Sequence, residues 1–212
     1  MKRRYKQKKG FSLVEMVVVL GIMVMMLSIM IANFPAFRSQ ISLSIALHEM
    51  QLSLRQAQSY AIAVREFNSS FVAPICQALV SPPARFPPYG VSITKNTSNY
   101  VLFADIACSV KVSGPHKIYN SGSPYGFPEA IATTAMQGGV KVTRIDGFNG
   151  GSGVALNTAE IVYQRPSPSI IMFGEAGGTW NSYQVIDITL SSNGGAITKV
   201  IRVRTSGQIS IQ

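Results

Sequence analysis

Apolar residues fill the chain almost without interruption over residues 11–32, and Glu15 is the one charged residue among them. An α-helix rises about 1.5 Å per residue, so this segment is long enough to cross the roughly 30 Å apolar core of a bilayer. It is also longer than the apolar region of a secretory signal peptide, which usually holds about 7 to 15 residues. The pattern therefore predicts a transmembrane helix, with a discarded signal peptide as the alternative.

Beyond this segment the apolar positions take on a helical period. Pro35 should bend or interrupt the helix, because proline lacks an amide hydrogen and clashes with the preceding turn. Over residues 33–66 we expect an amphipathic continuation of the helix, in which apolar residues recur at alternating intervals of four and three from residue 43 onward. A stripe of only about three heptads favours packing against the chain's own sheet over a coiled coil. Its members are Leu43, Leu47, Met50, Leu54, Ala57, Ala61 and Val64.

From residue 67 onward, short β-branched or aromatic runs alternate with Gly, Pro, Asn and Ser, which predicts strands separated by turns. The clearest pair of runs flanks Asn193-Gly194, a step that favours the positive φ angles of a hairpin turn. With the preceding helix, these runs predict an α+β fold in which residues 67–212 form an antiparallel β-rich domain. The predicted strands cover residues 90–94, 100–106, 117–120, 140–145, 160–164, 170–173, 183–190, 196–204 and 208–211.

Basic residues are concentrated ahead of the apolar segment. Because basic flanks stay on the cytoplasmic side of a membrane, we expect residues 1–10 inside and everything after residue 32 outside, which makes this a single-pass membrane protein. The cations elsewhere exceed the acids only modestly, so the composition does not by itself indicate a nucleic-acid-binding protein. The formal net charge is +10, and six of its basic residues are Lys2, Arg3, Arg4, Lys6, Lys8 and Lys9.

Glu15 is the unusual residue of the apolar segment. A carboxylate within a membrane span costs on the order of a few kcal/mol and marks a function or a buried partner. Residues 11–32 contain no cation that could be this partner. Residues 8–15, KKGFSLVE, resemble the cleavage signal of type IV prepilins and pseudopilins: a short basic leader, then Gly10, Phe11 as the first mature residue, and Glu15 at the fifth mature position.

This resemblance implies that a membrane-embedded prepilin peptidase cuts between Gly10 and Phe11, so that residues 1–10 are a removed leader. It also implies that the new Phe11 amine is commonly methylated, and that Glu15 can neutralise the terminal amine of a neighbouring subunit. Burial would strengthen such a pair, although desolvation opposes it. The expected partners are the peptidase, membrane lipid and other pilins that contact the N-terminal helix. The protein would reside in the cytoplasmic membrane and then in an extracytoplasmic filament.

Four further segments are similar to GspH/FimT-type minor pseudopilins and minor pilins. That resemblance implies a long helix laid against two small β-sheets, and a structural subunit of either a type IV pilus or a type II secretion pseudopilus. The segments are SLRQAQSYAIAVREF at 53–67, YGVSI at 89–93, YVLFAD at 100–105 and VIRVRTSGQISI at 200–211.

DNA binding is the alternative function, because some minor pilins of the FimT type bind DNA during uptake. Lys199, Arg202 and Arg204 lie on one predicted strand, where Arg202 and Arg204 share a face. Three cations neutralise few phosphates, however, and the basic motif that follows the last glycine in DNA-binding relatives is replaced here by residues 208–210, Gln-Ile-Ser. We therefore expect a solvated strand face, with nucleic acid as the less favoured partner.

Cys76 and Cys108 are the two cysteines of the chain. An even number of cysteines in an exported domain is compatible with a disulfide, and two buried thiols are the alternative. A bond between them would close a loop that contains the proline-rich segment 81–90. Sequence alone does not decide between these alternatives, because it does not show whether the two Cβ atoms meet.

No catalytic constellation is recognisable, so we predict a protein that is not an enzyme and needs no cofactor or metal. His48 and His116 have no second ligand at metal spacing. The glycine-rich segments at 149–153 and 175–180 lack the flanking elements of a phosphate loop and are interpreted as flexible turns. Trp180 is expected to be packed. The acids are scattered singly, as Asp105, Asp146, Glu160, Glu175 and Asp187.

Overall fold

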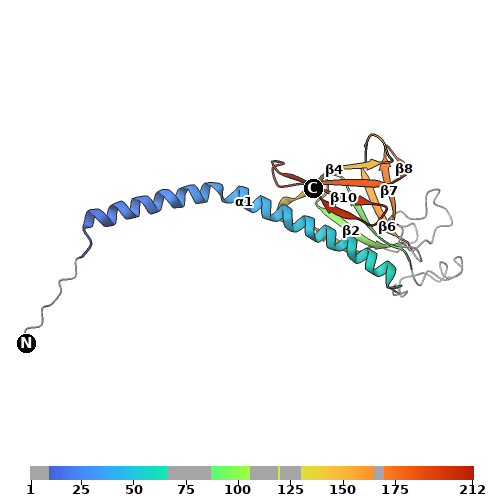
Figure 1. Cartoon of the computed structure of the whole chain (residues 1–212), viewed down its shortest axis with the longest axis horizontal. Helices are drawn as coiled ribbons and strands as arrows, with labels where there is room; N and C mark the ends of the chain where they lie inside the picture. The colour runs from blue at the N-terminus through green and yellow to red at the C-terminus, as the bar shows by residue number, and fades with distance from the viewer. Residues whose placement is uncertain (1–9, 66–86, 106–118, 120–129, 165–169) are drawn as a thin grey trace, which may run out of the picture. The chain divides into compact units, whose positions relative to one another are not determined.

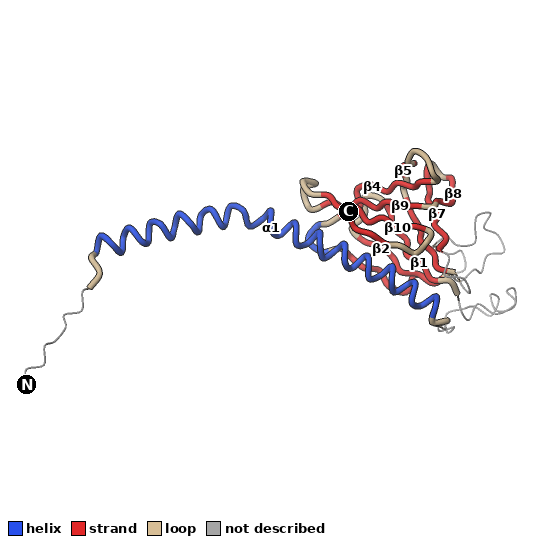
Figure 2. Tube along the Cα trace, in the orientation of Figure 1, coloured by secondary structure: helices blue, strands red, loops and turns tan. Residues whose placement is uncertain are grey.

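The computed structural model describes residues 10–65, 87–105, 119, 130–164 and 170–212, and its elements are drawn in Figures 1 and 2. Chain contacts divide it into two units, Met1–Arg38 and Ser39–Gln212. Cys76, Cys108 and His116 lie outside the described residues. The predicted strand at 117–120 does as well, apart from Tyr119, which belongs to no strand.

One helix, α1, runs from Leu13 to Ile62 and includes Pro35. The proline therefore does not end the helix, since it removes one backbone hydrogen bond while the turns on either side continue. The helix stops four residues before the predicted end at residue 66. Val64 adopts a left-handed φ of 52°, and the amides of Val64 and Arg65 donate to the carbonyls of Ala61 and Tyr60. This is the Schellman arrangement that terminates helices.

The strands form two antiparallel sheets, which confirms the α+β fold. The six-stranded sheet has the order β3-β2-β1-β6-β7-β8. Its strands are β1 (Tyr89–Thr94), β2 (Asn99–Ala104), β3 (Ala130–Ala135), β6 (Thr158–Tyr163), β7 (Ile170–Ala176) and β8 (Thr179–Tyr183).

The five-stranded sheet has the order β11-β10-β9-β4-β5. A short 3-10 helix, Gln137–Gly139, precedes β4. The strands of this sheet are β4 (Lys141–Phe148), β5 (Val154–Ala155), β9 (Val185–Ser191), β10 (Thr198–Arg204) and β11 (Ile209–Ile211).

All predicted strands within the described residues correspond to observed ones, but β3, β5 and β8 were not predicted. β3, with the sequence AIATTA, exposes most of its side chains and lies at a sheet edge, so it shows little alternation of apolar and polar residues. β8, with the sequence TWNSY, lies at the opposite edge and is mostly polar. Edge strands carry weak apolar patterns because one side of the strand has no neighbour to pack against.

The helix stripe packs against these sheets, as predicted for six of its seven members. Leu43, Leu47, Met50, Leu54, Ala57 and Ala61 are all buried and belong to one core with the inner faces of the strands. Each large aliphatic side chain buried in this way contributes about 1.5 to 3 kcal/mol. Val64 is the exception, because it follows the helix end and is 44% exposed. The C-terminal part of α1 lies alongside the strands in Figure 1.

Several of the turns that connect the strands contain glycines with positive φ. Gly177 and Gly178 both have positive φ and form the two-residue loop of the β7–β8 hairpin, closed by the pair Ala176 and Thr179. The segment 175–180, predicted as a flexible turn, is thus a hairpin and not a loose loop. Gly178 also donates its amide to the Glu175 carboxylate. The predicted hairpin around Asn193-Gly194 is confirmed between β9 and β10.

Candidate functional site

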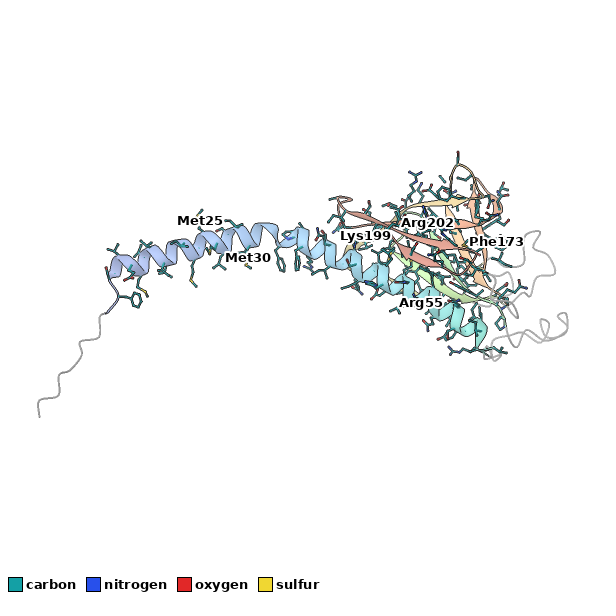
Figure 3. All side chains as sticks on the ribbon, viewed as in Figure 1. Met25, Met30, Arg55, Phe173, Lys199 and Arg202 are labelled. Atoms are coloured by element: carbon teal, nitrogen blue, oxygen red, sulfur yellow. The ribbon has the colours of Figure 1, made fainter. Side chains whose placement is uncertain are left out.

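The N-terminal part of α1 is apolar on every side. Each large apolar side chain described from Phe11 to Ile31 is at least half exposed, from 50% at Val19 to 80% at Leu13. Met25 and Met30, labelled in Figure 3, belong to this surface. A helix that is apolar all round is stable in lipid or among other apolar helices, but not in water. Among the described residues, α1 is the one helix long and apolar enough to cross a membrane.

The polar groups of this segment are few and mostly satisfied within the helix. The Ser28 hydroxyl donates to the carbonyl of Val24 at 2.8 Å. The helix begins with the Met16 amide donating to the Ser12 carbonyl at 3.2 Å. Glu15 lies in the first turn, where the unpaired backbone amides favour a negative charge. Gly10 and Phe11 precede the helix and are exposed. Within this segment, the exposed carboxylate of Glu15 and the exposed residues Gly10 and Phe11 are the groups that another protein could recognise.

The prokaryotic N-terminal methylation motif matches residues 5–31, the segment that holds Gly10, Phe11, Glu15 and most of the apolar surface. This match supports a type IV pilin-like protein. The motif and the apolar helix indicate membrane anchoring followed by pilus assembly. The match ends before the globular unit, so it does not distinguish the GspH/FimT type from other pilin-like proteins. No curated protein and no solved structure gives a match.

The three cations considered for DNA binding all lie on β10 of the five-stranded sheet. Side chains alternate between the two faces of a strand, so Arg202 and Arg204 share one face of β10. Lys199 is two and four residues from the buried Ile201 and Val203 and therefore belongs to the opposite face. Arg202 donates from Nε and Nη2 to the two carboxylate oxygens of Asp187, at 2.7 and 2.6 Å. Figure 3 labels Arg202 and Lys199 on the sheet.

This ion pair changes what Arg202 can do. The hydrogen bonds that Arg202 donates to Asp187 raise the pKa of Arg202, and the carboxylate compensates its charge. Of the three cations, one is therefore paired and another belongs to the opposite face. The hypothesis that they form a joint DNA-binding surface stays a prediction, and this arrangement gives it little support because phosphate binding depends on clustered free cations.

Two of the acids that are scattered singly along the sequence lie next to each other in the five-stranded sheet. Asp146 and Asp187 face each other across β4 and β9, and both are buried. Arg144 binds Asp146 at 2.7 Å from its own strand, so each carboxylate has an arginine. Oδ1 of Asp146 has no hydrogen-bond partner among the described residues. Two like charges placed opposite each other would be destabilising without these arginines.

Glu160 is a buried carboxylate on the six-stranded sheet. It accepts hydrogen bonds from the Ser92 hydroxyl at 3.3 Å and from the Tyr119 amide at 2.8 Å. These hydrogen bonds attach Tyr119 to the sheet, which is a structural role. In the described part of the chain, no group of three or more His, Cys, Asp or Glu could hold a metal ion.

His48, Trp180 and the segment 149–153, which were also considered from the sequence, lie within the helix, a strand and a loop of the globular unit. His48 is exposed on α1, and Trp180 is half-buried in β8 opposite Glu175. Glycine-rich segment 149–153 is anchored at its first residue, because the Asn149 side chain donates to the Ser182 carbonyl at 2.7 Å and accepts from the Gln184 amide at 2.9 Å. The apolar N-terminal helix with its methylation motif is therefore the principal candidate site.

Proposed function

We propose that this pilin-like protein is a minor pilin or pseudopilin, a structural subunit of an extracytoplasmic filament. A prepilin peptidase removes residues 1–10 by cutting between Gly10 and Phe11, and the new Phe11 amine is methylated. The subunit remains in the cytoplasmic membrane with its globular unit outside until it enters the filament. The observation that carries this proposal is the apolar surface on all sides of α1 up to Ile31, which lies within the segment that matches the N-terminal methylation motif.

Glu15 takes the role of charge partner during assembly. Cleavage creates a cationic amine at Phe11, and a carboxylate held in an apolar environment attracts such a cation far more strongly than one in water. Within residues 10–31 no cation is available. The amine of a neighbouring subunit supplies the missing positive charge, at the cost of removing both groups from water.

The processing step is tested by replacing Gly10 with valine and determining the N-terminus by mass spectrometry. We expect the mature wild-type chain to begin at Phe11 and the Gly10→Val chain to keep its leader, because the peptidase must accommodate the residue at the cut. Gly21→Val is the matched control, since neither glycine has an atom within 4 Å of an added Cβ. A leader removed normally from Gly10→Val, or a wild-type chain that begins at Met1 in its working form, would overturn the proposal.

The assembly step is tested with Glu15→Leu. We expect this variant to be cleaved and inserted in the membrane as the wild type is, but to be depleted at least tenfold from sheared filaments, as measured by immunoblotting. Met16→Leu is the control, because it changes a neighbouring side chain on the same exposed helix without changing charge. Equal filament incorporation of both variants would contradict the charge-pairing role while leaving the processing step intact.

A further inference from the structure

A groove lies in the globular unit between the end of α1 and the turn that joins β10 to β11. It has a volume of about 530 Å³, and helix residues form most of its wall. Gly207 and Ile209 form the opposite wall. The helix side consists of Arg55, Gln58, Ser59, Ile62 and Ala63.

The lining combines one cation with two isoleucine side chains. Arg55, labelled on α1 in Figure 3, is exposed and supplies the positive charge. Ile62 is 64% exposed although it lies in the last turn of the helix, and Ile209 is only half-buried. Gln58 and Ser59 add hydrogen-bonding groups between them. An exposed aliphatic side chain beside a guanidinium fits a ligand that carries both a carboxylate and an apolar group.

Backbone hydrogen bonds hold the strand wall of the groove. Gly207 has a φ of 87°, and the turn is closed by hydrogen bonds from the Gly207 amide to the Arg204 carbonyl and from the Arg204 amide to the Gln208 carbonyl. β11 follows this turn and, among the described strands, pairs with β10 alone. A strand with one edge unpaired can accept an extended peptide through its backbone groups.

The charges of the globular unit indicate the sign of the partner. Of its described acids, Asp105, Asp146, Glu160 and Asp187 are buried, and Glu49 and Glu175 are half-buried. None of these six is exposed. The described surface is therefore more cationic than the composition suggests, because burial hides the acids and not the bases. The exposed cations are Arg55, Arg65, Lys141, Arg144, Lys199 and Arg204.

We propose that this groove binds an extended acidic segment of another protein, with a carboxylate on Arg55 and an aliphatic side chain between Ile62 and Ile209. Backbone groups of the segment pair with the unpaired edge of β11. A different protein is favoured over a second copy, because none of the six described acids of the globular unit is among its exposed residues. This site is independent of leader removal and of Glu15, so it goes beyond the proposed filament role.

The test uses the full-length chain, purified in a non-ionic detergent, on an array of six-residue peptides that alternate aliphatic residues with Glu or Asp. Matched peptides carry Lys or Ser in place of the acids. We expect the acidic peptides to bind best and the lysine peptides least. Arg55→Glu should weaken acidic-peptide binding at least tenfold and improve lysine-peptide binding. Ile62→Ser should weaken binding of every apolar peptide, and N-methylation of alternate peptide amides should abolish strand pairing.

Lys141→Glu is the matched control, because it makes the same charge change at another exposed cation outside the groove. It should leave acidic-peptide binding within about twofold of the wild type. Thermal unfolding followed by circular dichroism checks that each variant is folded. Equal binding of acidic and lysine peptides, or equal losses in Arg55→Glu and Lys141→Glu, would overturn the proposal. So would self-association in sedimentation velocity that Arg55→Glu removes, since the groove would then bind a second copy.

Discussion

The two parts of α1 have the same backbone conformation but opposite relations to their surroundings. Between Leu13 and Ile31 the large apolar side chains are exposed on every side, whereas between Leu43 and Ala61 the apolar stripe is buried against the sheets. The difference lies in how apolar residues are distributed around the helix. An all-round distribution requires an apolar solvent or other helices, while a stripe requires one packed face. The first part therefore depends on its environment, and the second on the chain's own contacts.

The strongest test of this comparison replaces one leucine in each part. Leu47→Ala should destabilise the globular unit by about 2 to 5 kcal/mol, because it leaves a cavity in a packed core. Leu20→Ala should change the same free energy of unfolding by less than about 0.5 kcal/mol, since Leu20 is 56% exposed. Both are measured by denaturant unfolding in detergent. A similar loss in the two variants would show that the parts are not energetically separate.

The dependence of the globular unit on its own contacts is tested next with two arginines of β10. Arg202→Ala should cost about 1.5 to 3 kcal/mol, because it removes two charge-assisted hydrogen bonds and leaves Asp187 beside Asp146. Arg204→Ala, on the same strand and face but exposed, should cost less than about 0.5 kcal/mol. Chemical denaturation of both variants provides the comparison. Equal midpoints would mean that the Asp187 pair contributes nothing to stability.

A smaller effect is expected at the β7–β8 hairpin. Gly178→Ala should destabilise by about 1 kcal/mol, because Gly178 has a φ of 83° that L-residues adopt at a cost. Gly151→Ala is the control, since an added Cβ there meets no atom within 4 Å and the residue lacks a positive φ. The difference in melting temperature between the two variants measures the conformational cost alone. Identical melting temperatures would remove this account of the turn.

The smallest effect appears at high pH. Burial raises the pKa of Tyr163 above its ordinary value of 10.0, and its hydroxyl has no hydrogen-bond partner among the described residues. The neutral form is thus favoured in the folded state, so the contribution of Tyr163 to stability is intact well below pH 10 and is lost as the pH approaches and exceeds 10. At pH 10 the loss from this group is about 0.4 kcal/mol relative to pH 8. Tyr163→Phe should reduce that alkaline loss, as measured by unfolding at both pH values, and an unchanged pH dependence would contradict this.

Features that depend only on neighbouring residues could be predicted from the sequence. The helix stripe repeats regularly along the chain, so its buried face could be predicted. The candidate cleavage and assembly residues are contiguous within residues 8–15, and their roles stay predictions. The end of the helix was not, because Val64 is a β-branched residue in a conformation that normally requires glycine. The helical spacing of apolar residues continues to Val64, whereas the helix itself ends at Ile62.

The ion pair of Arg202 shows why the rest could not be predicted. A two-residue turn at Asn193-Gly194 would have placed Arg202 opposite Val185. The observed loop is longer, so Ser191 pairs with Thr198 and Arg202 pairs with Asp187. Hairpin register thus decided whether the arginine was free or compensated. The groove beside Arg55 likewise brings together residues from two distant segments, which no local pattern records.

The side-chain anchor at Asn149 has a practical consequence. Its bonds to Ser182 and Gln184 hold the start of the loop, and an added Cβ at Gly150 or Gly151 would meet no other atom within 4 Å. An epitope tag inserted between these two glycines would begin beyond the anchor and leave both sheets undisturbed. The protein therefore offers a position for immunogold labelling, by which single subunits could be located along an intact fibre.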